Sequence, residues 1–217
     1  VFHSYYKNPE STAETKDSEG WVATGDAGFF DDEGHLKIID RAKDVGRMKD
    51  GTMFAPKYIE NKLKFFPYIK EVVAFGNEKV FASAMICIDI EAVGNWAERR
   101  NLAYSGYTDL STRKEVYDLV QECVETVNAD LARDEKLRGS QIKRYLLLHK
   151  ELDADDGEIT RTRKVRRRII ADKYGELIEA LDDPQQTHRE IESQMTFEDG
   201  RVGTVQADLQ IREVALV

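Results

Sequence analysis

The stretch IKEVVAFGNEKVFASAMICIDI, residues 69–90, decides the fold of the larger part of the chain. Two runs rich in apolar and β-branched side chains, residues 69–75 and 82–90, flank the polar segment Gly76–Lys79. β-Branched residues favour strands, and a short polar segment that contains glycine favours a turn. The pattern therefore predicts two strands that pair around residues 76–79.

Helices and one further strand are predicted around this pair. Pro56 can open a helix with Ile59 and Leu63 on its apolar face, and Pro67 ends it. The other predicted elements are a helix at 91–101, an amphipathic helix at 112–133, a strand at 142–149 and a helix at 165–181. The predicted strands and helices are interspersed without an internal repeat, which indicates a mixed α+β fold.

The two ends of the chain have a different pattern. Residues 20–41 predict short strands around the turn Asp31–Gly34, and residues 43–51 form a polar connector. Near the other end, alternating apolar residues from 195 to 211 predict a β-hairpin with its turn at 198–200. The predicted fold is α+β: a small domain with a short antiparallel or mixed sheet flanked by helices, preceded by a β-rich stub and followed by a hairpin.

Composition restricts the classes of function. The 217-residue chain has a formal net charge of −9, which argues against a dedicated nucleic-acid binder. Its two cysteines, Cys87 and Cys123, lack metal-ligand spacing and lie in apolar patterns, so we expect buried free thiols and a reducing compartment. No apolar run reaches membrane-spanning length. The histidines have no ligand spacing, and no metal site is predicted.

One segment of this acidic chain is strongly basic. The stretch DGEITRTRKVRRR, residues 156–168, holds six cations: Arg161, Arg163, Lys164, Arg166, Arg167 and Arg168. Three interpretations compete: a solvated helix face, a nucleic-acid contact, or a cation that points at a phosphate during a reaction. The net charge disfavours the second interpretation.

Four motifs together resemble a known superfamily. They are WVATGD (21–26), DRAKD (40–44), GTMFAPKYIE (51–60) and the basic stretch with Lys164. Their order and spacing resemble the C-terminal third of the adenylate-forming (ANL) enzymes. The form of DRAKD and of the Thr-x-Thr-x-Lys ending is most similar to long-chain fatty acyl-CoA synthetases, and the resemblance covers about residues 4–183.

The resemblance implies an activity and a domain organisation. Such enzymes convert a carboxylate and ATP into an acyl-adenylate and pyrophosphate, and CoA then forms the thioester. Residues 1–42 would end the large N-terminal AMP-binding domain, 43–183 would form a mobile lid, and 184–217 would be an extension with a helix and a hairpin. The phosphate loop, the Mg²⁺ glutamate and the acyl pocket are absent from these residues, so we expect the fragment alone to be inactive.

The resemblance also assigns roles to residues of the first two motifs. Thr24, Asp26 and Arg41 would bind the nucleotide, with the Asp26 carboxylate accepting hydrogen bonds from the ribose hydroxyls. Lys43 would be the hinge between the two half-reactions. Apart from the resemblance, Asp26 can be read as a residue that shapes a turn, Arg41 as part of a surface salt bridge and Lys43 as an ordinary exposed lysine.

Lys164 is the candidate catalytic residue. It would reach the carboxylate and the α-phosphate, where negative charge gathers in the transition state. In the commoner form of this motif a glycine precedes the lysine, but here the preceding residue is Arg163. Arg47 and Gly51 would line the CoA path, and the arginines at 166–168 are predicted to be mainly solvated.

The implied ligands are ATP with Mg²⁺, a fatty acid, and CoA as substrate. We expect no nucleic-acid partner, and we expect a cytoplasmic location. Peripheral membrane contact and self-association through the tail remain open. The alternative function is a non-catalytic nucleotide- or protein-binding module derived from the same domain.

Overall fold

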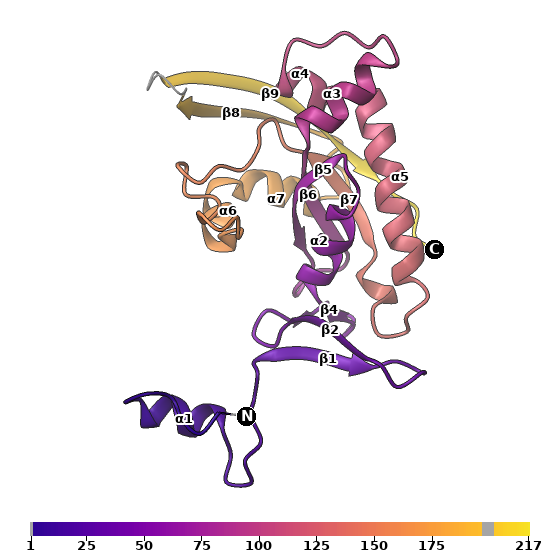
Figure 1. Cartoon of the computed structure of the whole chain (residues 1–217). Helices are drawn as coiled ribbons and strands as arrows, with labels where there is room; N and C mark the ends of the chain where they lie inside the picture. The colour runs from indigo at the N-terminus through magenta and orange to yellow at the C-terminus, as the bar shows by residue number, and fades with distance from the viewer. Residues whose placement is uncertain (1, 197–201) are drawn as a thin grey trace. The chain divides into compact units, whose positions relative to one another are not determined.

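The computed structural model describes residues 2–196 and 202–217. It divides the chain into two compact units, Val1–Val45 and Gly46–Val217. The division falls three residues after the boundary expected between residues 42 and 43. Figure 1 shows the order of the elements along the chain.

The first unit consists of one helix and a β-ribbon. Helix α1 (Pro9–Thr15) begins at Asn8, whose side chain accepts a hydrogen bond from a backbone N–H in the first turn. Strand β1 (Asp26–Phe30) pairs antiparallel with β2 (Leu36–Arg41), as the sequence predicts. The Asp31 carboxylate closes the turn by accepting the backbone N–H of His35 at 2.8 Å. Of the short strands predicted within residues 20–41, the first is reduced to one bridge, at residue 22.

Large apolar side chains are exposed in this first unit. They are Tyr5, Tyr6, Trp21, Phe30, Leu36 and Ile38. Phe30 pairs with Leu36 across the ribbon and Gly28 pairs with Ile38, so these positions share one face. A ribbon with such a face does not bury enough apolar surface to form a core of its own.

The second unit is built on a five-stranded mixed sheet with the strand order β5-β6-β7-β9-β8. Its strands are β5 (Ile69–Phe75), β6 (Ala82–Ile88), β7 (Ile142–Leu147), β9 (Val202–Glu213) and β8 (His188–Thr196). β6 and β7 are parallel, and the other neighbouring pairs are antiparallel. The predicted strands at 69–75, 82–90 and 142–149 are therefore confirmed, and so is the predicted mixed sheet flanked by helices.

The helices that follow β4 (Met53–Phe54) and precede β7 along the chain lie mainly on one face of the sheet. They are α2 (Pro56–Lys64), α3 (Ile90–Glu98), α4 (Tyr107–Thr112), α5 (Lys114–Leu131) and the short 3₁₀ helix η1 (Arg138–Ser140). Helix α2 lies against β5, and α5 lies against β7. Tyr117 of α5 stacks on Tyr145 of β7, with ring centroids 5.9 Å apart. The helix predicted at 112–133 begins two residues later, because Arg113 has extended backbone angles that separate it from α4.

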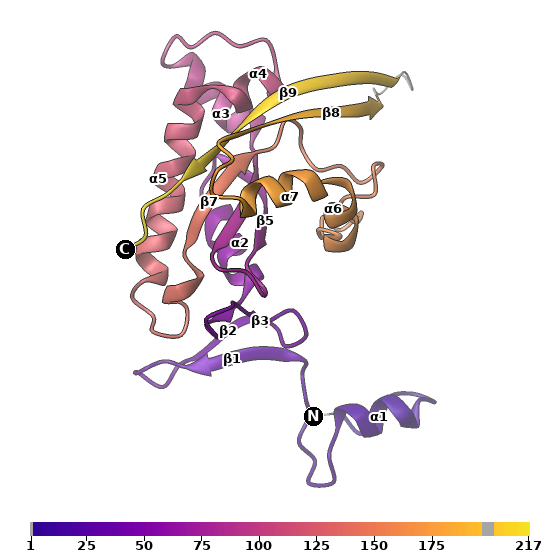
Figure 2. The ribbon, with the colours of Figure 1, turned by 180° about the vertical axis from the view of Figure 1, so that it is seen from behind.

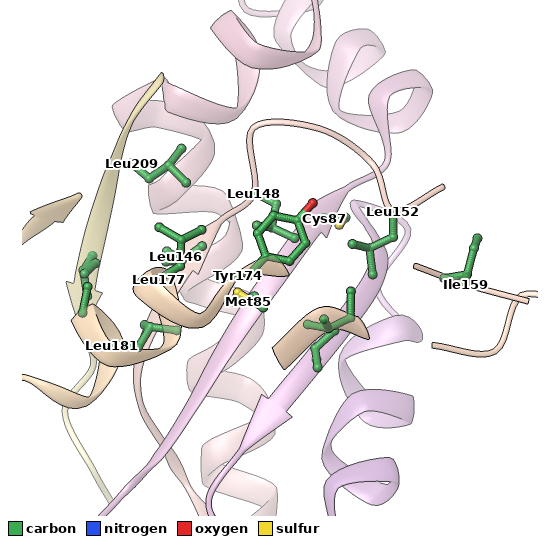
Figure 3. Packing of buried hydrophobic residues seen from close by; sticks show 14 residues of the cluster. Met85, Cys87, Leu146, Leu148, Leu152, Ile159, Tyr174, Leu177, Leu181 and Leu209 are labelled. Atoms are coloured by element: carbon green, nitrogen blue, oxygen red, sulfur yellow. The ribbon is translucent and has the colours of Figure 1, made fainter. Parts of the chain in front are cut away.

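Two short helices, α6 (Arg167–Lys173) and α7 (Gly175–Asp182), cover the opposite face (Figures 1 and 2). Figure 3 shows Tyr174, Leu177 and Leu181 beside Met85 and Leu146 of the sheet, in the same buried cluster. The sequence predicts one helix over 165–181. The break occurs at Tyr174, whose backbone leaves the helical region while its buried ring joins the core.

The C-terminal hairpin completes this sheet instead of standing apart from it. β9 pairs with β7 through three residue pairs, and Leu209 and Ile211 are buried in the core cluster. Arg144 of β7, itself buried, donates hydrogen bonds to the carbonyl oxygens of Ala180 and Leu181 at the end of α7. The predicted turn at 198–200 lies outside the described residues. Residues 184–196 and 202–217 contain no helix, so the helix expected in the extension is not found there.

Both cysteines are buried, as predicted. Burial raises the pKa of the Cys87 thiol to about 12 and that of Cys123 to about 11, so both are protonated and unreactive near neutral pH. Within residues 2–196 and 202–217, no helix is both long and apolar enough to cross a membrane.

His149 makes the stability of the second unit depend on pH. The residue is completely buried, and burial, reinforced by the charge of Lys150, lowers its pKa from 6.5 to about 4. Between these values the unfolded chain binds more protons than the folded chain, so the folded state loses stability as the pH falls from about 6.5 to 4. The loss attributable to His149 is at most about 3 kcal/mol.

Urea unfolding of the wild-type chain and of His149→Gln at pH 7 and pH 4.5 measures this contribution. The wild type is expected to lose more unfolding free energy on acidification than the variant does. Equal losses in the two proteins would show that His149 titrates normally in the folded state.

Candidate functional site

Three predicted nucleotide-binding residues lie together in the first unit. The guanidinium of Arg41 forms an ion pair with the Asp26 carboxylate at 2.8 Å and donates to the carbonyl oxygen of Thr24 at 3.3 Å. The backbone N–H of Asp26 donates to Thr24 Oγ1 at 3.2 Å. Because Asp26 and Arg41 are partners across β1 and β2, the ribbon fixes their pairing. All three side chains are exposed, so the Asp26 carboxylate can accept further hydrogen bonds.

Lys43 lies in a turn close to the division between the two units. The backbone N–H groups of Asp44 and Val45 both donate to the Arg41 carbonyl oxygen, at 2.9 and 3.2 Å. The Lys43 side chain is exposed. A change of the backbone angles of Lys43 therefore does not have to move the Lys43 side chain out of a buried position.

Arg47 and Gly51 belong to a small hairpin of the second unit, formed by β3 (Gly46–Arg47) and β4 (Met53–Phe54). Gly51 has φ = +87°, a conformation that other residues rarely adopt. Arg47 donates through Nη1 to the Gly51 carbonyl oxygen at 2.9 Å. The two predicted CoA contacts thus lie together, and part of the Arg47 guanidinium is used to brace the turn.

Lys164 is presented by a tight loop between two short bridged segments. Ile159 and Val165 form an antiparallel bridge at the base of the loop. The backbone N–H of Thr160 donates to the Lys164 carbonyl oxygen at 2.8 Å, and the Lys164 N–H donates to Thr160 Oγ1 at 3.0 Å. The Lys164 side chain is exposed. The backbone at this residue is therefore fixed while its ammonium group stays accessible.

Arg163, next to Lys164, has φ = +57°. This left-handed conformation costs an L-residue about 1–2 kcal/mol, and glycine adopts it without that cost. The observation explains why the commoner form of the motif has glycine at this position: the loop needs a positive φ there, and the present chain makes the same turn with arginine.

Arg163→Gly is therefore expected to raise the free energy of unfolding of the second unit by about 0.5–1 kcal/mol. Arg161→Gly is the matched control, because Arg161 is equally exposed and lies in the same loop without a positive φ. Urea denaturation compares the two variants. The interpretation is wrong if Arg163→Gly destabilises the chain as much as Arg161→Gly does.

A buried charge cluster fixes the segment that enters the loop. Glu158 is completely buried, and its carboxylate accepts hydrogen bonds from Lys150 Nζ at 2.9 Å, from Tyr174 Oη at 2.8 Å and from the backbone N–H of Asp153 at 3.0 Å. Its own carbonyl oxygen accepts the N–H of Arg166 on the opposite side of the loop at 2.8 Å. None of these contacts is predicted from the sequence.

A second buried carboxylate holds the segment that leaves the loop, and it corrects the prediction for residues 166–168. Arg166 and Arg168 are exposed, as predicted, but Arg167 is not simply solvated. Its guanidinium forms an ion pair with Glu60 of α2 and donates to the Ala74 carbonyl oxygen of β5 at 3.0 Å. The prediction failed because the partners lie 93 and 107 residues away along the chain.

No metal centre accompanies these residues: residues 2–196 and 202–217 contain no group of three or more His, Cys, Asp or Glu side chains that could hold a metal ion. The exposed ammonium of Lys164 and the Asp26–Arg41 pair can instead bind anionic and hydroxyl groups of a ligand. They belong to different units of the chain.

Most of the chain is similar in sequence to known proteins. The family described as AMP-binding enzyme C-terminal domain matches residues 43–186. The long-chain-fatty-acid–CoA ligase FadD15 of Mycobacterium tuberculosis is 32% identical over 182 residues, which cover 83% of this chain and 29% of the ligase. Human long-chain-fatty-acid–CoA ligase 1 is also 32% identical, over 83% of this chain and 26% of its own length.

Solved structures show the same fold. The adenylation domain of a carboxylate reductase from Mycobacterium chelonae superimposes with a TM-score of 0.56 at 26% identity, over 83% of this chain and 26% of that one. A second carboxylic acid reductase domain, from Segniliparus rugosus, has a TM-score of 0.57 at 19% identity. This chain spans less than a third of the length of these relatives. It belongs to the AMP-binding enzyme C-terminal domain family and thereby to the ANL superfamily of adenylate-forming enzymes.

Proposed function

We propose that this chain is the C-terminal part of an ATP-dependent fatty acyl-CoA ligase. The complete enzyme would convert a fatty acid and ATP into an acyl-adenylate and pyrophosphate, and would then transfer the acyl group to the thiol of CoA with release of AMP. The observation that carries the proposal is the exposed ammonium of Lys164 on a fixed loop, in a chain whose similar relatives are long-chain-fatty-acid–CoA ligases.

Lys164 would act in the first half-reaction. When the carboxylate oxygen attacks the α-phosphorus, negative charge increases on the non-bridging phosphate oxygens and then on the departing pyrophosphate. An ammonium group placed beside these oxygens stabilises the transition state more than the ground state. The chain offers Lys164 for this role because no carboxylate among the described residues forms an ion pair with it.

The ribose of ATP would be bound by the cluster in the first unit. The Asp26 carboxylate has two acceptor oxygens, and one of them pairs with Arg41. The other oxygen is available to a ribose hydroxyl. Arg41 would orient Asp26 and add a positive charge near the nucleotide.

Lys43 would be the hinge about which the second unit rotates between the two half-reactions. The residue lies in an exposed turn close to the division between the units. Rotation there would carry the whole second unit, so Lys164 would leave the nucleotide and the turn with Arg47 and Gly51 would approach it. CoA would then be bound along that turn.

The exposed apolar face of the first unit supports a place within a larger domain. Phe30, Leu36 and Ile38 lie on one side of the β1–β2 ribbon and are more than half exposed. Apolar surface of this kind is normally covered by another part of the protein. We propose that the rest of the AMP-binding domain covers it and supplies the Mg²⁺, triphosphate and acyl sites.

The isolated chain tests this proposal. Purified residues 1–217 are expected to show no acyl-CoA formation from fatty acid, ATP and CoA, whereas the complete polypeptide that contains this chain is expected to turn over. Thioester formation by the isolated chain would contradict the proposed division of the active site. Absence of any turnover by the complete polypeptide, with a range of fatty acids, would instead favour a non-catalytic binding module.

A further inference from the structure

We propose that Arg167 positions Lys164 for adenylate formation through its contacts with Glu60 and Ala74. This inference rests on the proposed function and adds a residue to it. Arg167 is the first residue of α6 and follows Lys164 by three positions. Its guanidinium reaches across to α2, where it forms an ion pair with Glu60, and to β5, where it donates to the Ala74 carbonyl oxygen at 3.0 Å.

Glu60 is a rigid partner. Only 1% of its surface is exposed, and its carboxylate also accepts the backbone N–H of Ala74 at 3.0 Å and Lys57 Nζ at 2.8 Å. The Glu60 carboxylate is therefore held by contacts with both α2 and β5 that do not involve Arg167. Both Arg167 bonds end on one junction between these two elements, and a planar guanidinium with two engaged nitrogens has little freedom to rotate.

The loop that carries Lys164 is anchored on both sides, and Arg167 is the second of these anchors. On the entering side, Glu158 is held in the core by Lys150 and Tyr174. On the leaving side, the corresponding anchor is Arg167. Lys164 lies between these two anchors on a loop closed by the bridge between Ile159 and Val165. Two fixed ends define where the exposed ammonium group is delivered.

Loss of the Arg167 contacts would loosen the leaving side without removing the core. Ile170 and Tyr174 of the same segment stay buried in the cluster beneath α6 and α7. The Arg166 N–H can still donate to the Glu158 carbonyl oxygen. We therefore expect a folded domain in which Lys164 is displaced. A displacement of about 1 Å at a reacting group can cost about a hundredfold in rate.

The experiment compares three variants in the complete ligase polypeptide. Arg167→Gln removes the positive charge and the planar guanidinium, whereas Arg167→Lys keeps the charge. Arg168→Gln removes an exposed neighbouring cation and is the matched control. Adenylate formation is measured by ATP–pyrophosphate exchange, and thioester formation is measured from supplied acyl-adenylate and CoA. Thermal unfolding is recorded for each protein.

Arg167→Gln is expected to lower kcat for adenylate formation about 10- to 100-fold, with KM for ATP and fatty acid unchanged within about twofold. Thioester formation from supplied adenylate stays near the wild-type rate. Arg167→Lys recovers part of kcat, because an ammonium can pair with Glu60 but cannot also reach the Ala74 carbonyl oxygen in the same geometry. Arg168→Gln behaves like the wild type.

Glu60→Gln supplies the coupling test. In a double-mutant cycle, Arg167→Gln should lower kcat much less in the Glu60→Gln background than in the wild type, because the shared contact is already lost. A folded Arg167→Gln protein with wild-type kcat would overturn the inference. So would an equal loss in both half-reactions, which indicates general damage to the domain.

Lys164→Ala in the same assay separates this inference from the proposed function. If Lys164→Ala abolishes adenylate formation while Arg167→Gln leaves it intact, only the positioning role fails. If Lys164→Ala has no effect on adenylate formation, the proposed role of Lys164 in the first half-reaction fails, and the Arg167 result cannot restore it.

Discussion

Lys164→Ala in the complete polypeptide, which we propose to be a ligase, is expected to lower the rate of adenylate formation by about 10²–10³-fold, the usual effect of removing one group that stabilises transition-state charge. The ammonium is exposed on a loop whose backbone is fixed by Thr160, so it can approach a phosphate without a rearrangement of its own segment. The fold should be unaffected because the Lys164 side chain is exposed.

The exchange of label between pyrophosphate and ATP measures this rate directly. Arg161→Ala is the matched control, since it removes another exposed cation from the same loop. It should change the rate by less than about threefold, as expected for a surface charge that is screened by solvent. Similar losses in both variants would show that the positive potential of the whole loop, and not Lys164 itself, drives the reaction.

Lys150→Met is expected to destabilise the second unit by about 3–5 kcal/mol, the typical cost of leaving one charge of a buried pair without its partner. Lys150 Nζ lies 2.9 Å from the completely buried carboxylate of Glu158 and 2.5 Å from the Asp156 carboxylate. Methionine fills a similar volume but donates no hydrogen bond. Glu158 would keep Tyr174, one backbone N–H and the more distant, partly exposed Lys173, which compensate its charge only in part.

Urea denaturation of the purified chain measures this loss. Lys173→Met is the control, because Lys173 also approaches Glu158, at 3.3 Å, but its side chain is 41% exposed. Its removal should cost no more than about 1 kcal/mol. A Lys150→Met protein as stable as Lys173→Met would show that Glu158 does not depend on a buried cation.

Much of the fold was predictable from local patterns. The runs at 69–75 and 82–90 and the helix of Pro56 form as expected, because periodicity and turn residues act over short distances. The single helices expected at 112–133 and 165–181 were partly wrong. Arg113 and Tyr174 interrupt the helical backbone, and for Tyr174 a tertiary contact, the bond to Glu158, accompanies the break.

The candidate site was predictable only in part. Motif resemblance identified Thr24, Asp26 and Arg41, and the structure brings these three together. Lys164 was identified in the same way, and its exposure agrees with a role in binding an anion. The roles of all these residues remain predictions.

The supporting contacts were not predictable from the sequence. Arg167 lies in a run of arginines that gives no local sign of which member is paired, and Glu60 and Glu158 resemble ordinary surface glutamates in the sequence. Their burial depends on the packing of α2, β5 and α6, elements that are far apart along the chain. Such charge pairs are recognised only when the fold has brought the partners together.

The central claim is that Lys164 serves the first half-reaction and not the second. The most direct measurement supplies pre-formed acyl-adenylate and CoA to the Lys164→Ala protein and follows thioester release in a single turnover. A rate within about threefold of the wild type, beside the collapse of adenylate formation in the same preparation, is the result that we predict. A thioester rate reduced as strongly as the adenylation rate would contradict the claim that this ammonium group serves adenylate formation alone.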